Sequence, residues 1–179
     1  MNLTAQQLAQ GLSCPLDRAT AWCAPLNAAM ARFAINTPHR VAAFIAQVGH
    51  ESGRLAYVRE IWNPAQCPWQ AHYEGRADLG NIHPGDGSLY RGRGLIQITG
   101  RDNYRACGIA LGLPLESSPA LLEKPDNAAL SAAWFWATHG CNELADQGDL
   151  HAITHVINGG YNGLRDRLAL FDQAKSTFA

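Results

Sequence analysis

Long apolar runs are missing from this sequence. No stretch approaches the roughly 20 consecutive apolar residues that a membrane-spanning helix needs. The first residues, Met1 to Gln7, also lack the basic start and the apolar core of a secretory signal. We therefore expect no membrane insertion, and we expect synthesis in the cytoplasm.

An excess of charge of either sign is missing as well. Lysine and arginine number 14 and aspartate and glutamate 15, which gives a formal net charge of -1. No overall field attracts a polyanion, so we expect no nucleic-acid partner. Locally, seven arginines face five acids between positions 54 and 105. This mildly basic region suits a substrate that carries carboxylates, and structural ion pairing is the alternative explanation.

Cysteine pairs with the spacing of metal or redox sites are absent. The five cysteines are odd in number and widely spaced, and none forms a C-x-x-C motif. We expect free, buried thiols. A disulfide between Cys14 and Cys23 in an oxidising compartment is the alternative.

The seven histidines raise the alternative of a zinc peptidase or amidase. His50 and Glu51 are followed by Ser-Gly-Arg rather than by the x-x-His that completes a zinc motif. His151 and His155 lie four residues apart on a predicted helix, without an obvious third ligand. We therefore expect no metal and no cofactor.

The composition is that of an ordinary globular protein. Hydrophobic residues make up 47% of the 179 residues and charged residues 16%, so the chain can bury a core of its own. The length favours a single domain over residues 1–179, built as two lobes around a cleft. We divide it into an N-terminal helical segment, 1–36, and a core, 37–179.

Capping residues and apolar periodicity predict a mainly α protein. Thr4 opens a capping box, and Thr37 and Pro38 begin a helix whose apolar residues from Val41 to Val48 recur with helical spacing, so that one face is buried. Further helices are expected over residues 15–34, 102–111, 125–138, 149–157 and 164–178.

Residues 52–99 are rich in Gly, Pro, Asn and Asp and predict loops or short strands. Loops of this length usually carry function. Gln97 and Thr99 alternate with Ile96 and Ile98 as on a short strand, which would turn an amide and a hydroxyl toward sugar hydroxyl groups. The glycines of this block do not complete a phosphate-binding motif, so nucleotide binding is not expected.

Two carboxylates are candidates for acid and base catalysis. Glu51 falls at the edge of the buried helix face, near the helix C-terminus. Partial burial and the helix dipole both disfavour its charged form there, and a general acid needs the protonated form. A surface glutamate paired with Arg54 is the alternative. Glu60 follows in a loop, and two carboxylates in different environments can divide the work of glycosidic hydrolysis.

Several segments, in the same order, resemble glycoside hydrolase family 19, which contains chitinases and many phage endolysins. The resemblance runs from about Val41 to the C-terminus, and its Tyr90–Tyr104 block is highly specific. The matching segments are His50-Glu51-Ser52-Gly53, Glu60, Tyr90–Tyr104, Ala133–Trp136 with Asn142–Asp146, and Ile157–Gly160.

The resemblance implies a lysozyme-like, two-lobed helical fold in which the loop-rich middle, with minor β structure, forms one wall of the cleft. It implies that Glu51 is the general acid and Glu60 the general base of an inverting mechanism without a metal. It also implies a water-positioning role for Thr99, and a cleft lined by Tyr90, Gln97, Asn103, Asn158 and Arg167.

The chain departs from the family directly after the second carboxylate. Relatives often read Glu-x-Leu-x-Tyr there, whereas this chain reads Glu60-Ile-Trp-Asn-Pro64. Trp62 and Trp69 can either stack on sugar rings or fill a lobe. The block from Gly159 to Arg167 is short compared with plant chitinases, and this difference in length affects the assignment of Arg167 to the cleft.

From the resemblance we expect an endolysin of muramidase type, from a phage or prophage, that cleaves β-1,4 bonds of peptidoglycan to lyse the host cell. The reasons are the missing secretion signal, the missing chitin-binding segment and the likeness to short phage forms. A chitinase of N-acetylglucosamine polymers is the alternative, and a wall-binding module without activity is another. We expect a monomer, made in the host bacterial cytoplasm, that reaches the wall in the periplasm through a holin-type partner.

Overall fold

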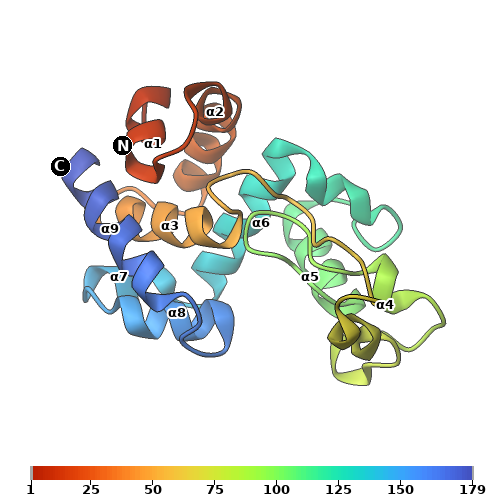
Figure 1. The fold of residues 1–179 in the computed structure, drawn as a ribbon. Coiled ribbons are helices and arrows are strands. Elements are labelled where there is room, and N and C mark those ends of the chain that lie inside the picture. Colours follow the sequence, from red (N-terminus) through yellow and green to blue (C-terminus); the bar gives the residue numbers. More distant parts are fainter. Residues whose placement is uncertain (1, 179) are drawn as a thin grey trace.

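Helices account for most of the computed structural model, which describes residues 2–178 (Figure 1). No helix within these residues combines the length and the apolar character needed to cross a membrane. The α-helices are α1 (Ala5–Leu12), α2 (Leu16–Arg32), α3 (Pro38–Glu51), α4 (Asp86–Leu89), α5 (Arg101–Leu111), α6 (Pro125–Thr138), α7 (Cys141–Asp146), α8 (Leu150–Asn158) and α9 (Leu164–Phe178). Short 3-10 helices are η1 (Pro68–Tyr73), η2 (Ala77–Leu79) and η3 (Pro119–Glu123).

Helix α3 lies at the centre of the larger lobe. Thr37 caps its start and Pro38 occupies its first turn, as the sequence predicts. The expectation of one buried face was wrong, because every residue from Val41 to Gly49 is buried. Small residues on the remaining faces let other helices approach closely. A Cβ atom at Gly49, for example, would lie 2.4 Å from Leu12 Cδ2 on α1.

The larger lobe surrounds α3 with α1, α7 and α9, while α2 packs on α1 and α6 (Figure 1). Both ends of the described chain belong to this lobe, since α1 packs directly against α9. The capping box predicted at Thr4 is present and starts α1. The N-terminal segment is therefore built into the same core as the last helix.

The smaller lobe has a separate apolar cluster and shares α6 with the larger lobe. One side of α6 is rich in alanine and lies in the larger core, whereas Trp134 and Phe135 pack against the smaller cluster. In Figure 1, α6 runs between the two groups of helices. The buried residues of the smaller cluster are Tyr90, Ile98, Tyr104, Cys107, Leu115 and Leu122.

The loop-rich segment predicted over residues 52–99 is confirmed, but the short strand predicted around Gln97 is wrong. Arg93 and Ile98 exchange backbone hydrogen bonds of 3.1 and 2.8 Å across a turn of four residues. Within this turn Gln97 takes a left-handed φ of 61°. In the described part of the chain, β structure is limited to this bridge and a second one between Arg59 and Arg93.

The five cysteines are free, as the sequence predicts, and Cys14 and Cys23 form no disulfide. The predicted burial was wrong for Cys14, Cys23 and Cys67, which are half-buried. Cys107 and Cys141 are fully buried, and burial raises the pKa of each thiol to about 12. These two side chains therefore act as small apolar groups that pack in the two cores.

Glu116 connects several parts of the smaller lobe. Its carboxylate accepts hydrogen bonds from Arg101 at 3.1 Å and from Arg105 at 2.8 and 2.9 Å. Its backbone carbonyl accepts a hydrogen bond from the hydroxyl of Tyr90 at 2.9 Å. Arg105 and then Arg101 lower the pKa of Glu116 from 4.5 to about 2, because both stabilise the charged form.

Replacing Glu116 by glutamine should lower the free energy of unfolding at neutral pH. Because the folded-state pKa lies below the unfolded value, this stabilisation is fully present above pH 4.5 and is lost as the pH falls toward 2. Urea unfolding at a series of pH values should show the difference from wild type shrinking in that window. Glu143→Gln, an exposed change on α7, is the control. A constant difference at every pH would contradict the ion-pair explanation.

Candidate active site

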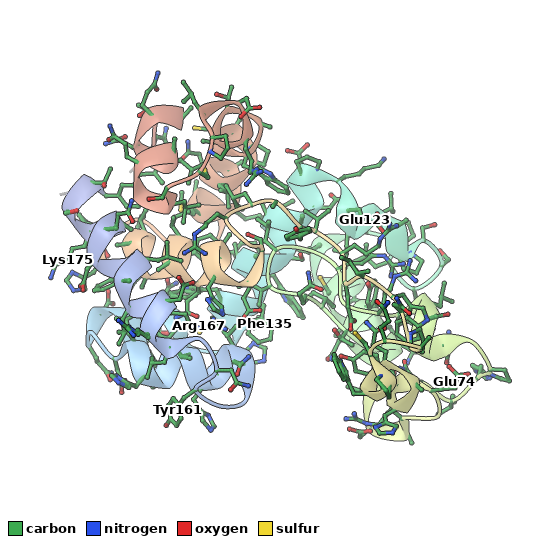
Figure 2. All side chains as sticks on the ribbon, viewed as in Figure 1. Glu74, Glu123, Phe135, Tyr161, Arg167 and Lys175 are labelled. Atoms are coloured by element: carbon green, nitrogen blue, oxygen red, sulfur yellow. The ribbon has the colours of Figure 1, made fainter. Side chains whose placement is uncertain are left out.

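Glu51 ends α3 and is held by an arginine from the last helix. The carboxylate is half-buried and accepts a hydrogen bond from Nη2 of Arg167, whose side chain is buried. Nη1 of Arg167 donates to the side chain of Gln47, and Gln47 donates to Thr154 at 3.2 Å. A chain of buried polar groups therefore runs from α8 through α3 to α9 and fixes the position of Glu51. Figure 2 shows Arg167 in the middle of the larger lobe.

The alternative pairing of Glu51 with Arg54 is wrong. Arg54 forms an ion pair with Asp166 at 2.6 Å, and Nδ1 of His50 lies 2.7 Å from the same carboxylate. Although partial burial opposes this, the hydrogen bonds from Arg54 and His50 lower the pKa of Asp166. Gly163 is required here, because a Cβ atom would lie 2.1 Å from Cε1 of the His50 ring. Residues at the start of α9 thus bind Glu51 and also His50 and Arg54 on either side of it.

Glu60 occupies a different electrostatic setting in the smaller lobe. Its Oε1 accepts a hydrogen bond from Gln70 at 2.9 Å, and its Oε2 accepts one from the backbone N–H of Gly92 at 3.2 Å. Within residues 2–178 no cationic side chain forms an ion pair with it. Gly92 lets the side chain of Gln97 approach closely, since a Cβ atom here would lie 2.3 Å from its Oε1. Glu51 therefore has a charged partner, whereas the partners of Glu60 are neutral.

A cavity of about 570 Å³ opens beside Glu60. Trp62 lines it and stacks against Tyr73, with ring centroids 6.1 Å apart, while Trp69 lies outside it and is 60% exposed. Arg91 and Glu123 were not among the predicted site residues. Arg91 lies inside the family-specific Tyr90–Tyr104 block, but the resemblance gave it no role, and Glu123 lies outside every matching segment. The full lining is Ala56, Tyr57, Val58, Arg59, Glu60, Ile61, Trp62, Arg91 and Glu123.

Three of the predicted cleft residues line a second cavity, of about 190 Å³. Gln97, Thr99 and Asn103 form one side of it, and α6 forms the other. Their polar groups also bond within the loop. Thr99 donates to the carbonyl of Gln97 at 3.2 Å, and Asn103 donates to the carbonyl of Thr99 at 2.7 Å. Neither Glu51 nor Glu60 lines this second cavity.

The other predicted cleft residues differ in exposure. Tyr90 is 1% exposed, its hydroxyl is bound to Glu116, and it therefore belongs to the core of the smaller lobe. Arg167 is also 1% exposed and reaches the site through Glu51. Asn158 is exposed at the end of α8. Tyr90 therefore has no exposed surface that a sugar could contact. The prediction that Asn158 contacts a sugar stays a prediction.

The histidines do not form a metal site in the part of the chain that the structure describes. No group of three or more His, Cys, Asp or Glu side chains is arranged to hold an ion there. His151 and His155 are both exposed on α8. His155 lies near the ring of Tyr161, with centroids 5.6 Å apart.

A helical fold of two lobes, with differently held carboxylates in each lobe, is the architecture of a lysozyme-like glycoside hydrolase. The comparison with known proteins agrees with this class. The class I chitinase family model matches residues 27–163, and the chain belongs to glycoside hydrolase family 19.

The relatives include bacterial and plant proteins. A glycosyl hydrolase family 19 domain-containing protein of Haemophilus influenzae is 36% identical over 155 residues, which cover 73% of this chain and 76% of that protein. An endochitinase of Arabidopsis thaliana is 39% identical over 127 residues, covering 70% of this chain and 41% of its own length. The chain spans half or less of the length of the plant endochitinases that it matches.

Solved bacterial chitinases share the fold of this chain over nearly its full length. A bacterial family 19 chitinase superposes with a TM-score of 0.78 at 26% identity, covering 98% of this chain and 94% of its own. Chitinase C of Streptomyces griseus gives a TM-score of 0.76 at 26% identity, covering 98% of this chain and 76% of its own. The protein is therefore a chitinase-like glycoside hydrolase whose first two helices are included in the structural match.

Proposed function

We propose that this family 19 hydrolase cleaves β-1,4 bonds in the glycan strands of bacterial peptidoglycan, with Glu51 as the general acid and Glu60 as the general base. The observation that carries this proposal is that a family 19 chain holds two carboxylates, one in each lobe, with different partners. Glu51 lies against the buried cation Arg167, whereas Glu60 has two neutral donors and borders the larger cavity.

The proposed reaction inverts the anomeric carbon. Glu51 gives its proton to the glycosidic oxygen as the C1–O bond breaks, and Glu60 takes a proton from the water that attacks C1 from the opposite face. Glu51 gains negative charge in this step, and Arg167 is in place to stabilise it. Thr99 is proposed to orient the water. Room for that water requires roughly 6.5–9.5 Å between the carboxyl groups.

The choice of peptidoglycan rests on the charge of the cavity beside Glu60. Two arginines and two glutamates line it, and of the arginines Arg91 has no carboxylate partner in the described chain. Peptidoglycan carries carboxylates on its stem peptides and on lactyl groups that bear no peptide, whereas chitin is uncharged. Chitin is the second candidate, because the plant relatives and the superposed bacterial enzymes are named as chitinases. Both polymers contain β-1,4-linked N-acetylated amino sugars, so the chemistry at the bond is the same.

We further propose an endolysin role in phage or prophage lysis. The protein would act as a monomer on the wall in the periplasm, after a holin-type partner lets it pass the inner membrane. We treat residues 1–179 as one catalytic domain. The packing of α1 on α9 and of α2 on α6 supports including the segment 1–36.

Digestion of purified sacculi and of chitin, followed by mass spectrometry of the soluble fragments, tests the substrate. We expect sacculi to release fragments with new reducing ends, whose identity distinguishes a muramidase from a glucosaminidase. Glu60→Gln protein is the control and should release at least about a hundredfold less. Cleavage of chitin with intact sacculi would show that the substrate is chitin. Peptide release without new reducing ends would show an amidase.

A further inference from the structure

One arginine in the cavity beside Glu60 has no counter-ion. The basic region between positions 54 and 105 contains seven arginines, and six of them form ion pairs with carboxylates. Arg91 is the seventh, and no carboxylate of the described chain pairs with it. Structural ion pairing therefore explains six arginines and leaves Arg91 without an explanation.

The hydrogen bonds of Arg91 are also incomplete. Nη1 donates to the carbonyl of Ser88 at 3.3 Å. Nε is buried and has no partner, and it is the one buried side-chain N or O atom in residues 2–178 of which this is true. Burial, and then the nearby Arg93 and Arg59, lower the pKa of Arg91, although a guanidinium stays charged at neutral pH. Since an unpaired buried donor is unfavourable, stability does not account for this arrangement.

Arg91 lies next to the proposed base. It directly precedes Gly92, whose N–H donates to Oε2 of Glu60. The other carboxylate lining the cavity, Glu123, is already shared by Arg59 at 3.3 Å and Arg93 at 2.7 Å. Figure 2 shows Glu123 on the smaller lobe, apart from Arg167. For an anionic group that enters the cavity, Arg91 is thus the lining cation that no described carboxylate has neutralised.

The size and the other walls of the cavity suit a substituted sugar. A volume of about 570 Å³ is within the usual range for small-molecule sites. Tyr57 and Trp62 supply aromatic surface beside the charged groups. One hydrogen bond to the carbonyl of Ser88 holds the guanidinium of Arg91, which leaves its other donors unpaired within residues 2–178.

We infer that Arg91 binds a carboxylate carried by the substituent of the sugar bound beside Glu60. The planar guanidinium would donate two parallel hydrogen bonds to that carboxylate and satisfy its unpaired donor. This inference rests on the proposed function, because carboxylates occur on the stem peptides and the peptide-free lactyl groups of peptidoglycan and not in chitin. Arg91 then selects the substrate, and takes no part in proton transfer.

Binding measurements with Glu51→Gln protein test the inference without turnover. The ligands are peptidoglycan glycan oligomers, the same oligomers with their carboxyl groups amidated, and chitin oligomers of equal length. Adding Arg91→Gln should raise the Kd for the native oligomers by about tenfold and leave the other two Kd values unchanged. With Arg91→Lys the Kd for native oligomers should lie between the values measured with arginine and with glutamine at this position, since lysine keeps the charge but cannot donate two parallel hydrogen bonds. Arg76→Gln, which removes an exposed arginine paired with Asp78, should change none of them.

Each outcome decides the inference separately from the proposed function. An unchanged Kd for native oligomers, or an equal loss for all three ligands, would overturn the role of Arg91. The proposed function fails instead if wild-type protein binds native oligomers and leaves them uncut. Oligomers stripped of peptide carry a carboxylate only on the lactyl group, which removal of the peptide sets free. An Arg91 effect that persists with them shows that Arg91 binds a lactyl carboxylate, and an effect lost with them assigns the peptide.

Discussion

Glu51→Gln protein is expected to hydrolyse glycan strands with a kcat lower by about two to four orders of magnitude. Glutamine has the shape of glutamate and its carbonyl oxygen can still accept the hydrogen bond from Arg167, so the packing at the end of α3 is kept. The amide cannot deliver a proton to the leaving oxygen. Initial rates of reducing-end formation measure the loss, and thermal unfolding followed by circular dichroism shows whether the fold is retained.

The control for this variant is Glu143→Gln. Glu143 is exposed on α7 and forms no ion pair within the described residues, so its rate should equal that of wild type. If Glu51→Gln kept the wild-type rate, Glu51 would not be the acid and the proposed mechanism would be wrong. If the variant lost activity together with its helical signal, the residue would be needed for folding, and the catalytic assignment would lose its support.

Helices whose start is encoded locally could be predicted from the sequence. Proline in the first turn marks α6, and a Gly-rich turn precedes α9. The predicted ranges 125–138 and 164–178 match the observed ones. Helix α7 was missed, because its six residues are too few to show a period. Burial on all sides of α3 was missed for a different reason. It depends on which helices pack against the alanines, and this is a tertiary property.

The partners of the candidate catalytic residues could not be predicted from the sequence. A spacing of three residues favours a pair between Glu51, the last residue of α3, and Arg54. The structure instead brings Asp166 and Arg167 from α9, more than a hundred positions away in the chain, and these take both partners. The strand around Gln97 failed because apolar and polar alternation also fits a turn, once one residue adopts a left-handed conformation.

Arg167→Met should give the largest loss of stability of the changes considered. Methionine fills much of the same space but removes the donors to Glu51 and Gln47, leaving a half-buried carboxylate and a buried amide oxygen without partners. Removing one member of a buried ion pair typically costs about 3–5 kcal/mol of unfolding free energy. Urea unfolding measures this loss. We also expect a lower kcat, because the charge that forms on Glu51 is no longer stabilised.

A double-mutant cycle separates the two effects of Arg167. If the arginine acts through Glu51, adding Arg167→Met to Glu51→Gln protein should lower kcat much less than it does in wild type, because the charge that it stabilises no longer forms. Arg165→Met, an exposed change two residues earlier on α9, should alter neither stability nor rate. Additive effects on kcat would mean that Arg167 contributes through the fold alone. The link from α9 through Glu51 to the reacting bond would then have to be abandoned.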